Sequence, residues 1–314
     1  MKAIVIEKTG GVENLIHTNI DKPKASKNEV LIKVDTISIN PVDFKVRAIE
    51  ELLNMICGEG YPAILGWDIA GEVVELGANT NQFNIGDKVF GMVNFLGRGN
   101  AYAEFVAAPQ NHLAKIPEGI SSESAAVTTL AALTALQALQ NNIKSGDKVL
   151  IHAGAGGVGH FAIQIAKHLG AYVATTTSAK NKDFVEQLGV DEHIDYQNQA
   201  FEKVLTDYDF VLDGVGGDEI LLNSIKVLKQ GGQLISLPSP AFSDKVMQTA
   251  EERNINLSFM MVQSNGEDMN TLAQFLENGT LKPHVSKIFS FSEMDKAHLQ
   301  LETSRTVGKV VVKI

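Results

Sequence analysis

Over the first 120 residues of the chain, apolar positions alternate with polar ones or gather in short runs. The runs are rich in Val, Ile and Phe and are separated by Gly, Pro and Asn; they cover Lys2–Lys8, Glu29–Ile39, Gly71–Gly77 and Asp87–Val93. β-Branched and aromatic residues between turn residues are typical of strands. The pattern therefore predicts a largely β module up to about Ile120.

The pattern changes at Ser121. Ser121, Ser122 and Glu123 form a typical helix start, and the segment 125–139 that follows is rich in Ala and Leu. These residues favour helix, so we place a domain boundary at this point.

Beyond this helix, six short apolar runs recur about every twenty residues, with helical patterns between most of them. The runs are Val149–Ala153, Tyr172–Ser178, His193–Tyr196, Phe210–Gly214, Gln233–Leu237 and Ile255–Val262. Such alternation is typical of βαβ units and a doubly wound parallel sheet. The tail predicts a helix over Met269–Gly279 and ends in a β run, Gly308–Ile314, that we expect to pair back onto the first module.

The fold class predicted from these patterns is α/β, with two domains. Residues 1–120 together with residues 265–314 are expected to form one domain, and residues 121–264 the other. A chain of 314 residues exceeds the size at which one hydrophobic core usually stops growing, which agrees with this division.

A glycine-rich turn between a predicted strand and a predicted helix carries the strongest chemical signal. Gly154, Gly156 and Gly159 form the pattern G-x-G-x-x-G, with Gly157 and Val158 between them. Missing side chains permit a tight turn and let a pyrophosphate approach the N-terminus of the helix. The helix presents one apolar stripe at helical spacing, made of Val158, Phe161, Ala162, Ile165, Ala166 and Leu169. Together the strand, turn and helix predict dinucleotide binding rather than a purely structural turn.

The end of the second predicted strand bears on which dinucleotide is bound. In such folds an acidic residue about twenty residues after the glycines receives the ribose hydroxyls of NAD. Here the strand ends in Ser178, and Lys180 and Lys182 follow. A hydroxyl and two cations suit a 2′-phosphate, so the sequence favours NADP(H). Alternatively, each lysine is only a solvated charge at a helix start.

Composition narrows the remaining possibilities. The net charge of −10, without long basic runs, argues against nucleic acid or an anionic membrane surface as partner. The N-terminal residues have neither the length nor the apolar character of a signal peptide or a membrane span, so we expect a cytoplasmic protein. Cys57 is the only cysteine and is expected to be an inert thiol. A metal would need His and carboxylate ligands, and the eight histidines show no metal-binding spacing.

In its motifs and their order, the chain resembles the medium-chain dehydrogenase/reductase superfamily, in its zinc-free quinone oxidoreductase branch. The similar segments cover nearly the whole length: SINPVDFKVR, YPAILGWDIAGEVVELG, FNIGDKVFGM, AAVTTLAALTALQAL, GDKVLIHAGAGGVGHFAIQIAKHLGA, LDGVGGD, LKQGGQLISL and TVGKVVVKI. The resemblance implies a GroES-like β-rich catalytic domain, a Rossmann-type NADP-binding domain and a cleft between them.

The resemblance also bears on zinc. Zinc-dependent members of the superfamily carry ligands at three positions that correspond here to Asn40, Trp67 and Leu130, which cannot form a zinc ligand set. We therefore expect no metal site, with Trp67 packed where the metal would lie; an exposed substrate-stacking role for Trp67 is the alternative. Asp68 is either a structural partner for a backbone or basic group or a residue that shapes the site.

Without a metal, hydride transfer to a conjugated acceptor is easier than reduction of a simple aldehyde, because a quinone or an α,β-unsaturated carbonyl spreads the developing charge. Asn40 and Tyr61 are the candidate hydrogen-bond donors to such a substrate. Asn40 is alternatively a turn residue before Pro41, and Tyr61 an ordinary core or surface tyrosine. Asp43 is expected to fix local backbone geometry.

The family resemblance supplies the other candidate residues. Thr129, the loop that contains Gly214 and Val215, and Leu237 are implied near the nicotinamide half of NADP(H). Tyr196 is implied near the adenine or its ribose phosphate, and Lys309 near the cofactor phosphates. The substrate pocket is expected from the loops Arg47–Tyr61 and Asn94–Tyr102, which no motif fixes in shape.

The strand run Ile255–Val262 ends the predicted parallel sheet, and an exposed strand edge invites pairing. We therefore expect a homodimer through this edge, with a covered edge in a monomer as the alternative. The leading hypothesis is a zinc-independent, NADPH-dependent reductase of quinones or enones, with that small molecule as its substrate. The alternatives are a catalytically idle NADP(H)-binding protein and a zinc alcohol dehydrogenase with unusual ligands.

Overall fold

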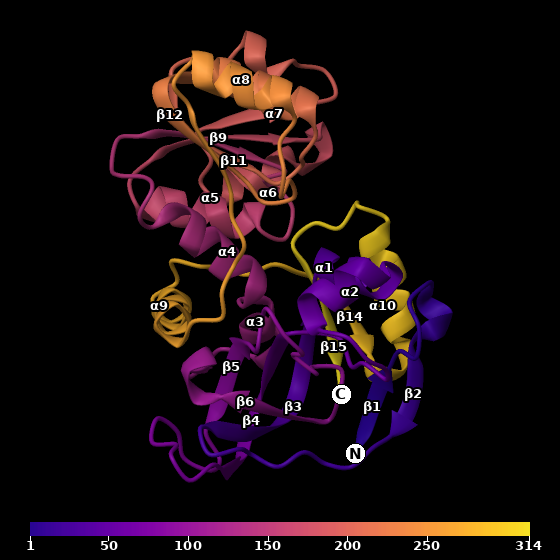
Figure 1. Ribbon diagram of the computed structural model, residues 1–314. Coiled ribbons are helices and arrows are strands. Elements are labelled where there is room, and N and C mark those ends of the chain that lie inside the picture. The colour runs from indigo at the N-terminus through magenta and orange to yellow at the C-terminus, as the bar shows by residue number, and fades with distance from the viewer. The chain divides into compact units, whose positions relative to one another are not determined.

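The computed structural model describes residues 1–314, and the chain forms two compact units (Figure 1). Residues 1–133 and 262–314 form one unit, called here the β-rich unit. Residues 134–261 form the other, called here the parallel-sheet unit.

The parallel-sheet unit is a single six-stranded sheet in the order β10-β9-β8-β11-β12-β13, with all neighbouring strands parallel. Its strands are β8 (Lys148–His152), β9 (Tyr172–Thr177), β10 (Glu192–Asp195), β11 (Tyr208–Asp213), β12 (Leu228–Ser236) and β13 (Asn256–Phe259). Its helices are α5 (Gly159–His168), α6 (Lys182–Gln187), α7 (Asp218–Val227) and α8 (Asp244–Glu252). The six predicted strands and their parallel arrangement are thus confirmed.

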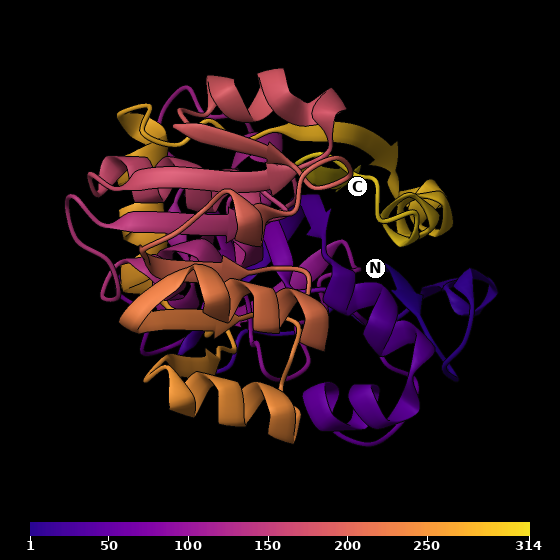
Figure 2. The same cartoon turned by 90° about the horizontal axis from the view of Figure 1, so that it is seen from above.

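Helices cover both faces of this sheet, with α7 and α8 above it and α5 below it in Figure 1. Seen from above, its strands run side by side (Figure 2). The predicted apolar stripe of α5 is buried at Phe161, Ala162, Ile165 and Ala166, and Val158 and Leu169 at its ends are half-buried. Parallel sheets need both faces covered, which explains why β8, β9 and β11 are buried along almost their whole length.

The β-rich unit contains a seven-stranded sheet and a two-stranded sheet. Its strands are β1 (Lys2–Val5), β2 (Ile16–Asn19), β3 (Glu29–Ile39), β4 (Asp68–Leu76), β5 (Lys88–Met92), β6 (Phe105–Pro109), β7 (Ala114–Lys115), β14 (Val285–Ser290) and β15 (Lys309–Lys313). Its helices are α1 (Pro41–Ala48), α2 (Glu50–Cys57), α3 (Ser122–Val127), α9 (Gly266–Glu277) and α10 (Met294–Glu302). A further helix, α4 (Leu130–Leu139), passes from this unit into the other.

Strand β3 organises the larger sheet. It pairs antiparallel with β4, with β6 over residues 29–33 and with β15 over residues 36–39. The expected return of the C-terminal β run onto the first module is therefore confirmed. The register places Val310 opposite Ile39 and Asp68 opposite Ser38, so Lys309, Asn40 and Asp68 lie at the same end of three adjacent strands.

The observed boundary between the units differs from the expected one. Ser121 does begin a helix, because its hydroxyl accepts a hydrogen bond from the Ser124 N–H at 3.2 Å. That helix, α3, packs on β3 and β4, and its Glu123 pairs with Lys313 of β15 at 2.6 Å. A helix cap reports where a helix starts, not where a domain ends, and the division falls instead between Leu133 and Thr134.

The Ala- and Leu-rich segment forms two helices rather than one. The hydroxyl of Thr128 donates to the Ser124 carbonyl at 2.8 Å, and that of Thr129 donates to the Ala126 carbonyl at 2.7 Å. Threonine side chains that bond back to the helix backbone compete with its continuation. The break at Thr128 and Thr129 separates α3 from α4.

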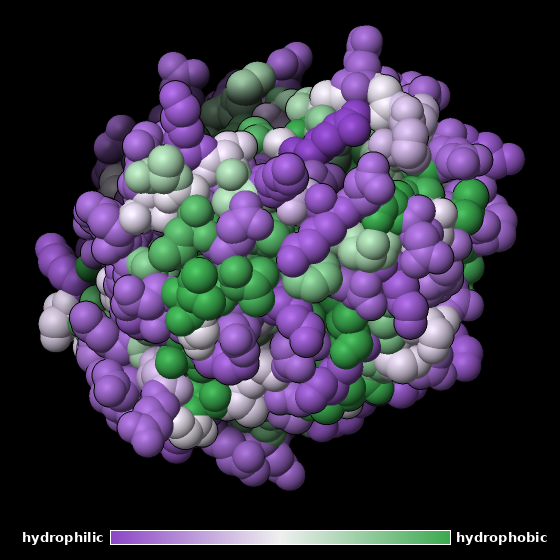
Figure 3. Space-filling model, turned by 90° about the horizontal axis from the view of Figure 1, so that it is seen from below, coloured by the Kyte–Doolittle hydropathy of each residue, from purple (hydrophilic) through white to green (hydrophobic).

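The surface facing the viewer in Figure 3 is mainly polar, with apolar side chains gathered near its middle. Such mixing is ordinary for a folded protein. None of the helices combines the length and apolar composition that a membrane crossing requires.

Candidate functional site

The glycine-rich turn follows β8 and leads into α5. It begins at Ala153, whose φ of 54° lies in the left-handed region that side chains other than glycine rarely adopt. A Cβ at Gly159 would collide with the backbone of Ala153 and Gly154, and a Cβ at Gly154 would collide with Thr175. The first and third glycines therefore permit the tight turn and the close packing of α5 on the sheet.

The middle of the turn is open. A Cβ at Gly156 would have only the Ala153 carbonyl oxygen within 4 Å, at 3.1 Å. The backbone N–H groups of Gly157, Val158 and Gly159 have no acceptor within the chain. Unpaired N–H groups at a helix N-terminus carry partial positive charge and bind phosphates. The turn therefore fits the pyrophosphate of a dinucleotide.

At the end of β9, the predicted 2′-phosphate residues differ in exposure. Ser178 is nearly buried, whereas Lys182 is exposed and lies 3.7 Å from Glu186 in a helical ion pair. Tyr196, after the adjacent strand β10, is exposed, and its N–H donates to the Thr177 carbonyl at 3.2 Å. Ser178 and Tyr196 thus follow neighbouring strand ends at the same edge of the sheet.

A carboxylate lies at this edge that the sequence reasoning did not consider. Asp195, the last residue of β10, accepts hydrogen bonds from the N–H groups of Ala179 and Gln197 at 3.2 Å each. The Asn198 amide also donates to it, and this bond lowers the pKa of Asp195. Its position directly before Tyr196 at a strand end was an available signal. Asp195 ties the turn after β9 to the turn after β10.

The loop after β11 is held by the buried carboxylate of Asp213. This carboxylate accepts from the N–H of Val215 at 2.8 Å and from the N–H of Gly216 at 3.0 Å. The Ser236 hydroxyl donates to it at 2.7 Å, and the Leu237 N–H donates to the Asp213 carbonyl at 2.9 Å. The predicted cofactor residues Gly214, Val215 and Leu237 are thereby brought together at the ends of β11 and β12.

His152 is a core histidine of the same sheet. Its Nδ1 lies 2.9 Å from the Thr176 hydroxyl, and its Nε2 lies 2.9 Å from the Ser224 hydroxyl. Because Ser224 donates to the Ile220 carbonyl, it accepts from His152, which assigns the proton to Nε2. Burial lowers the pKa of His152 to about 4, so this ring is neutral at pH 7.

In the β-rich unit, three predicted site residues meet around Asp68. The carboxylate of Asp68 accepts from the Asn40 amide at 2.7 Å and from the Leu130 N–H at 3.0 Å; burial raises its pKa, and Thr129 is among the neighbours that oppose this rise. The Lys309 ammonium lies 3.7 Å from the same carboxylate. Asp68 thus joins the ends of β3, β4 and β15 to the start of α4, and its reading as a structural partner of a backbone group and a basic group is confirmed.

Lys309 is almost completely enclosed. Its ammonium donates to the Ile39 carbonyl at 3.1 Å and to the Asn40 side-chain oxygen. Burial lowers the pKa of Lys309 and raises the pKa of Asp68, and the attraction between the two charges opposes both shifts. Since the amide oxygen of Asn40 faces Lys309 and the amide nitrogen faces Asp68, the orientation of this side chain is fixed.

A second buried chain of hydrogen bonds starts at Asp43. Its carboxylate accepts from the Asn40 N–H at 2.7 Å and from the Tyr102 hydroxyl at 2.9 Å. The expected role of Asp43 in fixing the backbone is confirmed by the first of these bonds. Burial, reinforced by the charge of Asp68, raises the pKa of Asp43 to about 7.

The chain continues through His298 of α10 to the surface. Tyr102 donates to Asp43 and therefore accepts from His298 Nε2 at 2.9 Å, which leaves Nδ1 to accept from Arg47 at 3.2 Å. Burial, and after it the Arg47 charge, lowers the pKa of His298 to about 3. Arg47 ends the chain in an ion pair with Glu302 at 2.7 Å. No buried side-chain nitrogen or oxygen is left without a hydrogen bond.

Trp67 has a packing role. Its side chain is completely buried, it packs edge-on against Phe95 with ring centroids 5.3 Å apart, and its Nε1 donates to the Gly97 carbonyl at 2.8 Å. A Cβ at Gly99 would collide with the indole ring. Burial excludes the alternative of an exposed stacking surface.

Tyr61 lies apart from the Asp68 cluster, with no hydrogen bond between the two. Its side chain is 37% exposed, and its hydroxyl has no hydrogen-bond partner within the chain. Cys57, at the end of α2, is buried, and burial raises the pKa of its thiol to about 11, as expected for an inert residue.

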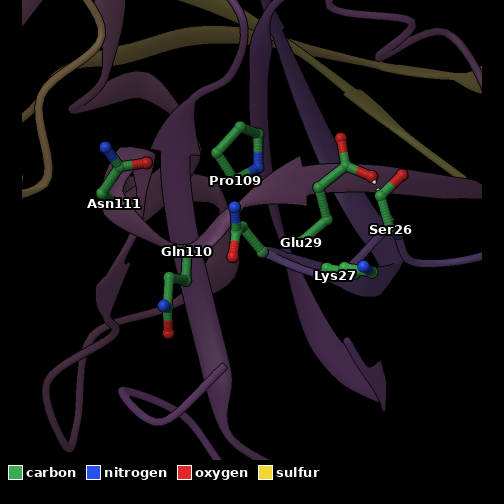
Figure 4. Close-up of a pocket in the computed structure, with 7 residues that line it drawn as sticks. Ser26, Lys27, Glu29, Pro109, Gln110 and Asn111 are labelled. Carbon is green, nitrogen blue, oxygen red and sulfur yellow. Dashed lines mark hydrogen bonds between the residues drawn. The ribbon is translucent and has the colours of Figure 1, made fainter. Parts of the chain in front are cut away.

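Two surface hollows, of about 750 and 720 Å³, lie in the β-rich unit. The first is lined by Ser26, Lys27, Asn28, Glu29, Pro109, Gln110 and Asn111 (Figure 4). In it, the Ser26 N–H donates to the Glu29 carboxylate at 3.0 Å. Neither hollow is lined by a predicted site residue. No three His, Cys, Asp or Glu side chains come together in a way that could hold a metal ion.

Two family models and several known proteins match this chain. The family model of the alcohol dehydrogenase GroES-like domain matches residues 26–118, and that of the zinc-binding dehydrogenase matches residues 188–312. The 2-methylene-furan-3-one reductase of Solanum lycopersicum is 33% identical over 99% of this chain and 79% of its own length. The chain belongs to the medium-chain dehydrogenase/reductase superfamily, in its quinone oxidoreductase branch.

Two further similarities fit this family. A chloroplastic NADPH-dependent alkenal/one oxidoreductase of Arabidopsis thaliana is also 33% identical, over 99% of this chain and 79% of its own length. The solved structure of a quinone oxidoreductase from Coxiella burnetii has a TM-score of 0.93 and 39% identity, covering 100% of this chain and 99% of that one. The GroES-like and Rossmann-type folds expected from the sequence are therefore confirmed.

Proposed function

We propose that the chain is an NADPH-dependent oxidoreductase that reduces quinones or α,β-unsaturated carbonyl compounds without a metal ion. The observation that carries the proposal is the glycine turn, which offers three unpaired N–H groups at the start of α5. When bound, the reduced nicotinamide supplies a hydride, while the protein binds and orients the reactants. The names of the two plant relatives and of the Coxiella structure support the acceptor class.

The preference for NADPH rests on the residues at the end of β9. Ser178 occupies the position where NAD-binding chains carry an acid, and Lys182 is exposed two residues beyond Lys180. These groups suit a 2′-phosphate, to which ammonium and hydroxyl groups donate charge-assisted hydrogen bonds. Exposed Tyr196 lies at the next strand end, where it is available to the adenine or its ribose.

Two residues of the β-rich unit are proposed to contact the acceptor. The free, partly exposed hydroxyl of Tyr61 is available to donate a hydrogen bond to a carbonyl oxygen on which negative charge develops. Asn40 uses its amide oxygen and nitrogen for Lys309 and Asp68, which leaves it one further N–H. Of the two, Tyr61 is the better placed for an incoming substrate.

Metal independence is supported by the chemistry of three positions. Asn40, Trp67 and Leu130 stand where the family's zinc-dependent members carry ligands, and neither an indole nor an aliphatic side chain ligates zinc. Asp68 instead joins the Asn40 side chain to the Leu130 N–H.

We also propose a homodimer formed through β13. This strand lies at the edge of the parallel sheet, and residues 257–260 are half-buried rather than covered. An uncovered strand edge pairs readily with a second copy of the same edge.

The test is a grid of NADPH and NADH against quinones, linear enones and saturated aldehydes, followed by loss of absorbance at 340 nm, with metal analysis of the purified protein. We expect NADPH to be the better donor and conjugated acceptors to outrun aldehydes, with no stoichiometric metal. Tight NADPH binding without turnover of any acceptor would identify an idle nucleotide-binding protein. Zinc that is required for activity would identify an alcohol dehydrogenase.

A further inference from the structure

The turn that leads from α2 to Tyr61 has few neighbours. It is the sequence Gly58-Glu59-Gly60, and both glycines have positive φ, 74° and 106°. A Cβ placed on Gly58 would meet no atom within 4 Å, and one placed on Gly60 would meet only the Arg98 side chain. All three residues are exposed. The backbone of this turn is therefore not fixed by packing.

Hydrogen bonds from Arg98 hold the backbone of this turn in place of packing contacts. The Arg98 Nε donates to the Cys57 carbonyl at 3.2 Å, and its Nη2 donates to the carbonyls of Glu59 at 2.9 Å and Gly60 at 2.6 Å. The other bonds nearby are local or lie outside the turn: the Gly58 N–H donates to the Asn54 carbonyl at the end of α2, and Ala63 pairs with Ile6. Arg98 is thus the only tertiary hydrogen-bond partner of residues 58–60.

Arg98 is itself carried by a well-anchored segment. The Asn94 N–H donates to His112 Nδ1 and the Phe95 N–H to the Ser264 hydroxyl, both at 3.1 Å. The carbonyl of Gly97, directly before Arg98, accepts from the buried Trp67 indole at 2.8 Å. The guanidinium therefore connects the exposed turn to a segment that is itself fixed by hydrogen bonds.

We propose that Arg98 is a positioning residue for the acceptor: by holding the backbone of residues 57–60, it sets the place of the Tyr61 hydroxyl and so determines which carbonyl acceptors are used well. This inference rests on the proposed function, because it requires an acceptor that takes a hydrogen bond from Tyr61. A guanidinium suits the role because it presents several donors in a fixed plane, whereas an ammonium does not.

The kinetic test compares Arg98→Ala and Arg98→Lys with the unchanged protein, using a small quinone and a bulkier enone. We expect Arg98→Ala to raise the KM of the preferred acceptor roughly tenfold and to reduce the ratio of kcat/KM between the two acceptors, while the KM of NADPH stays unchanged. Arg98→Lys should recover part of this loss. The matched control is Arg253→Ala, which removes a single arginine-to-carbonyl bond of 2.9 Å in the parallel-sheet unit and should leave acceptor KM unchanged.

A double-mutant cycle tests whether Arg98 acts through Tyr61. In a Tyr61→Phe background, Arg98→Ala should change acceptor KM by less than about twofold, since the group that it positions is already absent. Equal effects of Arg98→Ala with and without the Tyr61 hydroxyl would overturn the proposal, as would a parallel rise in the KM of NADPH.

Proteolysis gives a readout that needs no activity. Endoproteinase Glu-C cleaves after glutamate, and Glu59 lies in the middle of the turn. We expect Arg98→Ala to be cut between Glu59 and Gly60 several-fold faster than the unchanged protein and Arg253→Ala to be cut at the unchanged rate. Equal cleavage rates for Arg98→Ala and the unchanged protein would show that Arg98 does not hold the turn. If the unchanged protein reduces no acceptor, the proposed function and the selectivity role fail together, and the cleavage rates still decide whether Arg98 holds the turn.

Discussion

At the residue scale, the Asp68 cluster separates what sequence can predict from what it cannot. The family resemblance identifies the positions of Asn40, Trp67 and Leu130, and the chemistry of these residues then predicts that no zinc ligand set forms there. The sequence does not indicate that the Lys309 ammonium lies buried between Asn40 and Asp68, because 269 residues separate Lys309 from Asn40 along the chain. The predicted contact of Lys309 with the cofactor phosphates stays a prediction, and its ammonium already has three partners.

Replacing Lys309 with methionine should destabilise the fold strongly. The change leaves the completely buried Asp68 carboxylate without its cation, which typically costs about 3–5 kcal/mol. Lys313→Met is the control on the same strand, because it breaks the more exposed pair with Glu123, and such pairs contribute about 0.2–1 kcal/mol. Urea unfolding of both variants gives the comparison.

The double variant Asp68→Asn/Lys309→Met should recover part of the loss, since neither position then holds a buried charge without its partner. If Lys309→Met costs no more than Lys313→Met, the buried pair does not stabilise the fold as argued. Titration of both variants with NADPH shows in addition whether Lys309 contributes to phosphate binding.

Asp43 should give stability an unusual pH dependence. Its pKa is raised from 3.8 to about 7, mainly by burial, so between these values the folded chain holds a proton that the unfolded chain has released. The contribution of Asp43 to the free energy of unfolding is therefore full below pH 3.8, falls as the pH rises toward 7 and is constant above that.

Asp43→Asn keeps a neutral side chain at this position at every pH. The difference in unfolding free energy between the unchanged protein and this variant should decrease from pH 4 to pH 7, as measured by urea unfolding. His152 and His298 titrate in both proteins, so their effects largely cancel in the difference. A difference that is independent of pH would show that Asp43 is ionised throughout.

At the scale of single elements, the βαβ rhythm predicted all six strands of the parallel sheet, because buried parallel strands are short apolar runs. The single long helix expected after Ser121 did not form, since Thr128 and Thr129 turn their hydroxyls back onto α3. Asp195 ties two of the turns that carry predicted cofactor residues, and its only signal in the sequence is its place directly before Tyr196 at a strand end.

The glycines of the turn after β8 should respond differently to alanine. Gly159→Ala places a methyl group against the backbone of Ala153 and should lower thermal stability and NADPH affinity together. Gly156→Ala places it in open space, apart from one oxygen at 3.1 Å, and should weaken NADPH binding at least tenfold with little loss of stability. Thermal denaturation and nucleotide titration separate the two.

Gly279→Ala serves as a control for backbone strain without a ligand, because Gly279 has a φ of 75° and a Cβ added to it would meet no atom within 4 Å. It should lower stability slightly and leave NADPH binding unchanged. Normal NADPH affinity in Gly156→Ala would argue against close approach of a pyrophosphate to this residue.

At the scale of the whole molecule, residue patterns predicted two domains and the return of the C-terminal strand, but not where one unit ends. The helix start at Ser121 is a local signal, whereas the division depends on long-range contacts such as that of Glu123 with Lys313. The contact between Arg98 and the turn at Gly60 is also long-range, and nothing in the spacing of the two residues along the chain indicates that they meet.

The proposed dimer can be tested at the edge of the parallel sheet. Ser258→Lys introduces a charged side chain into β13, which should disfavour strand pairing between two copies and yield a monomer in light scattering after size exclusion. Ile288→Lys is the control, since Ile288 is 53% exposed on β14, the edge strand of the other sheet. An unchanged protein that is monomeric, or a Ser258→Lys variant that remains dimeric, would rule out pairing through β13.

The place of β15 has a consequence for synthesis on the ribosome. This strand, residues 309–313, inserts between β14 and β3, so one edge of residues 36–39 of β3 has no strand partner until residue 313 has been translated. All six strands of the parallel sheet precede it in the chain and are available earlier. In nascent chains the parallel-sheet unit should therefore become protease-resistant first, while β3 still has an open edge that chaperones can bind.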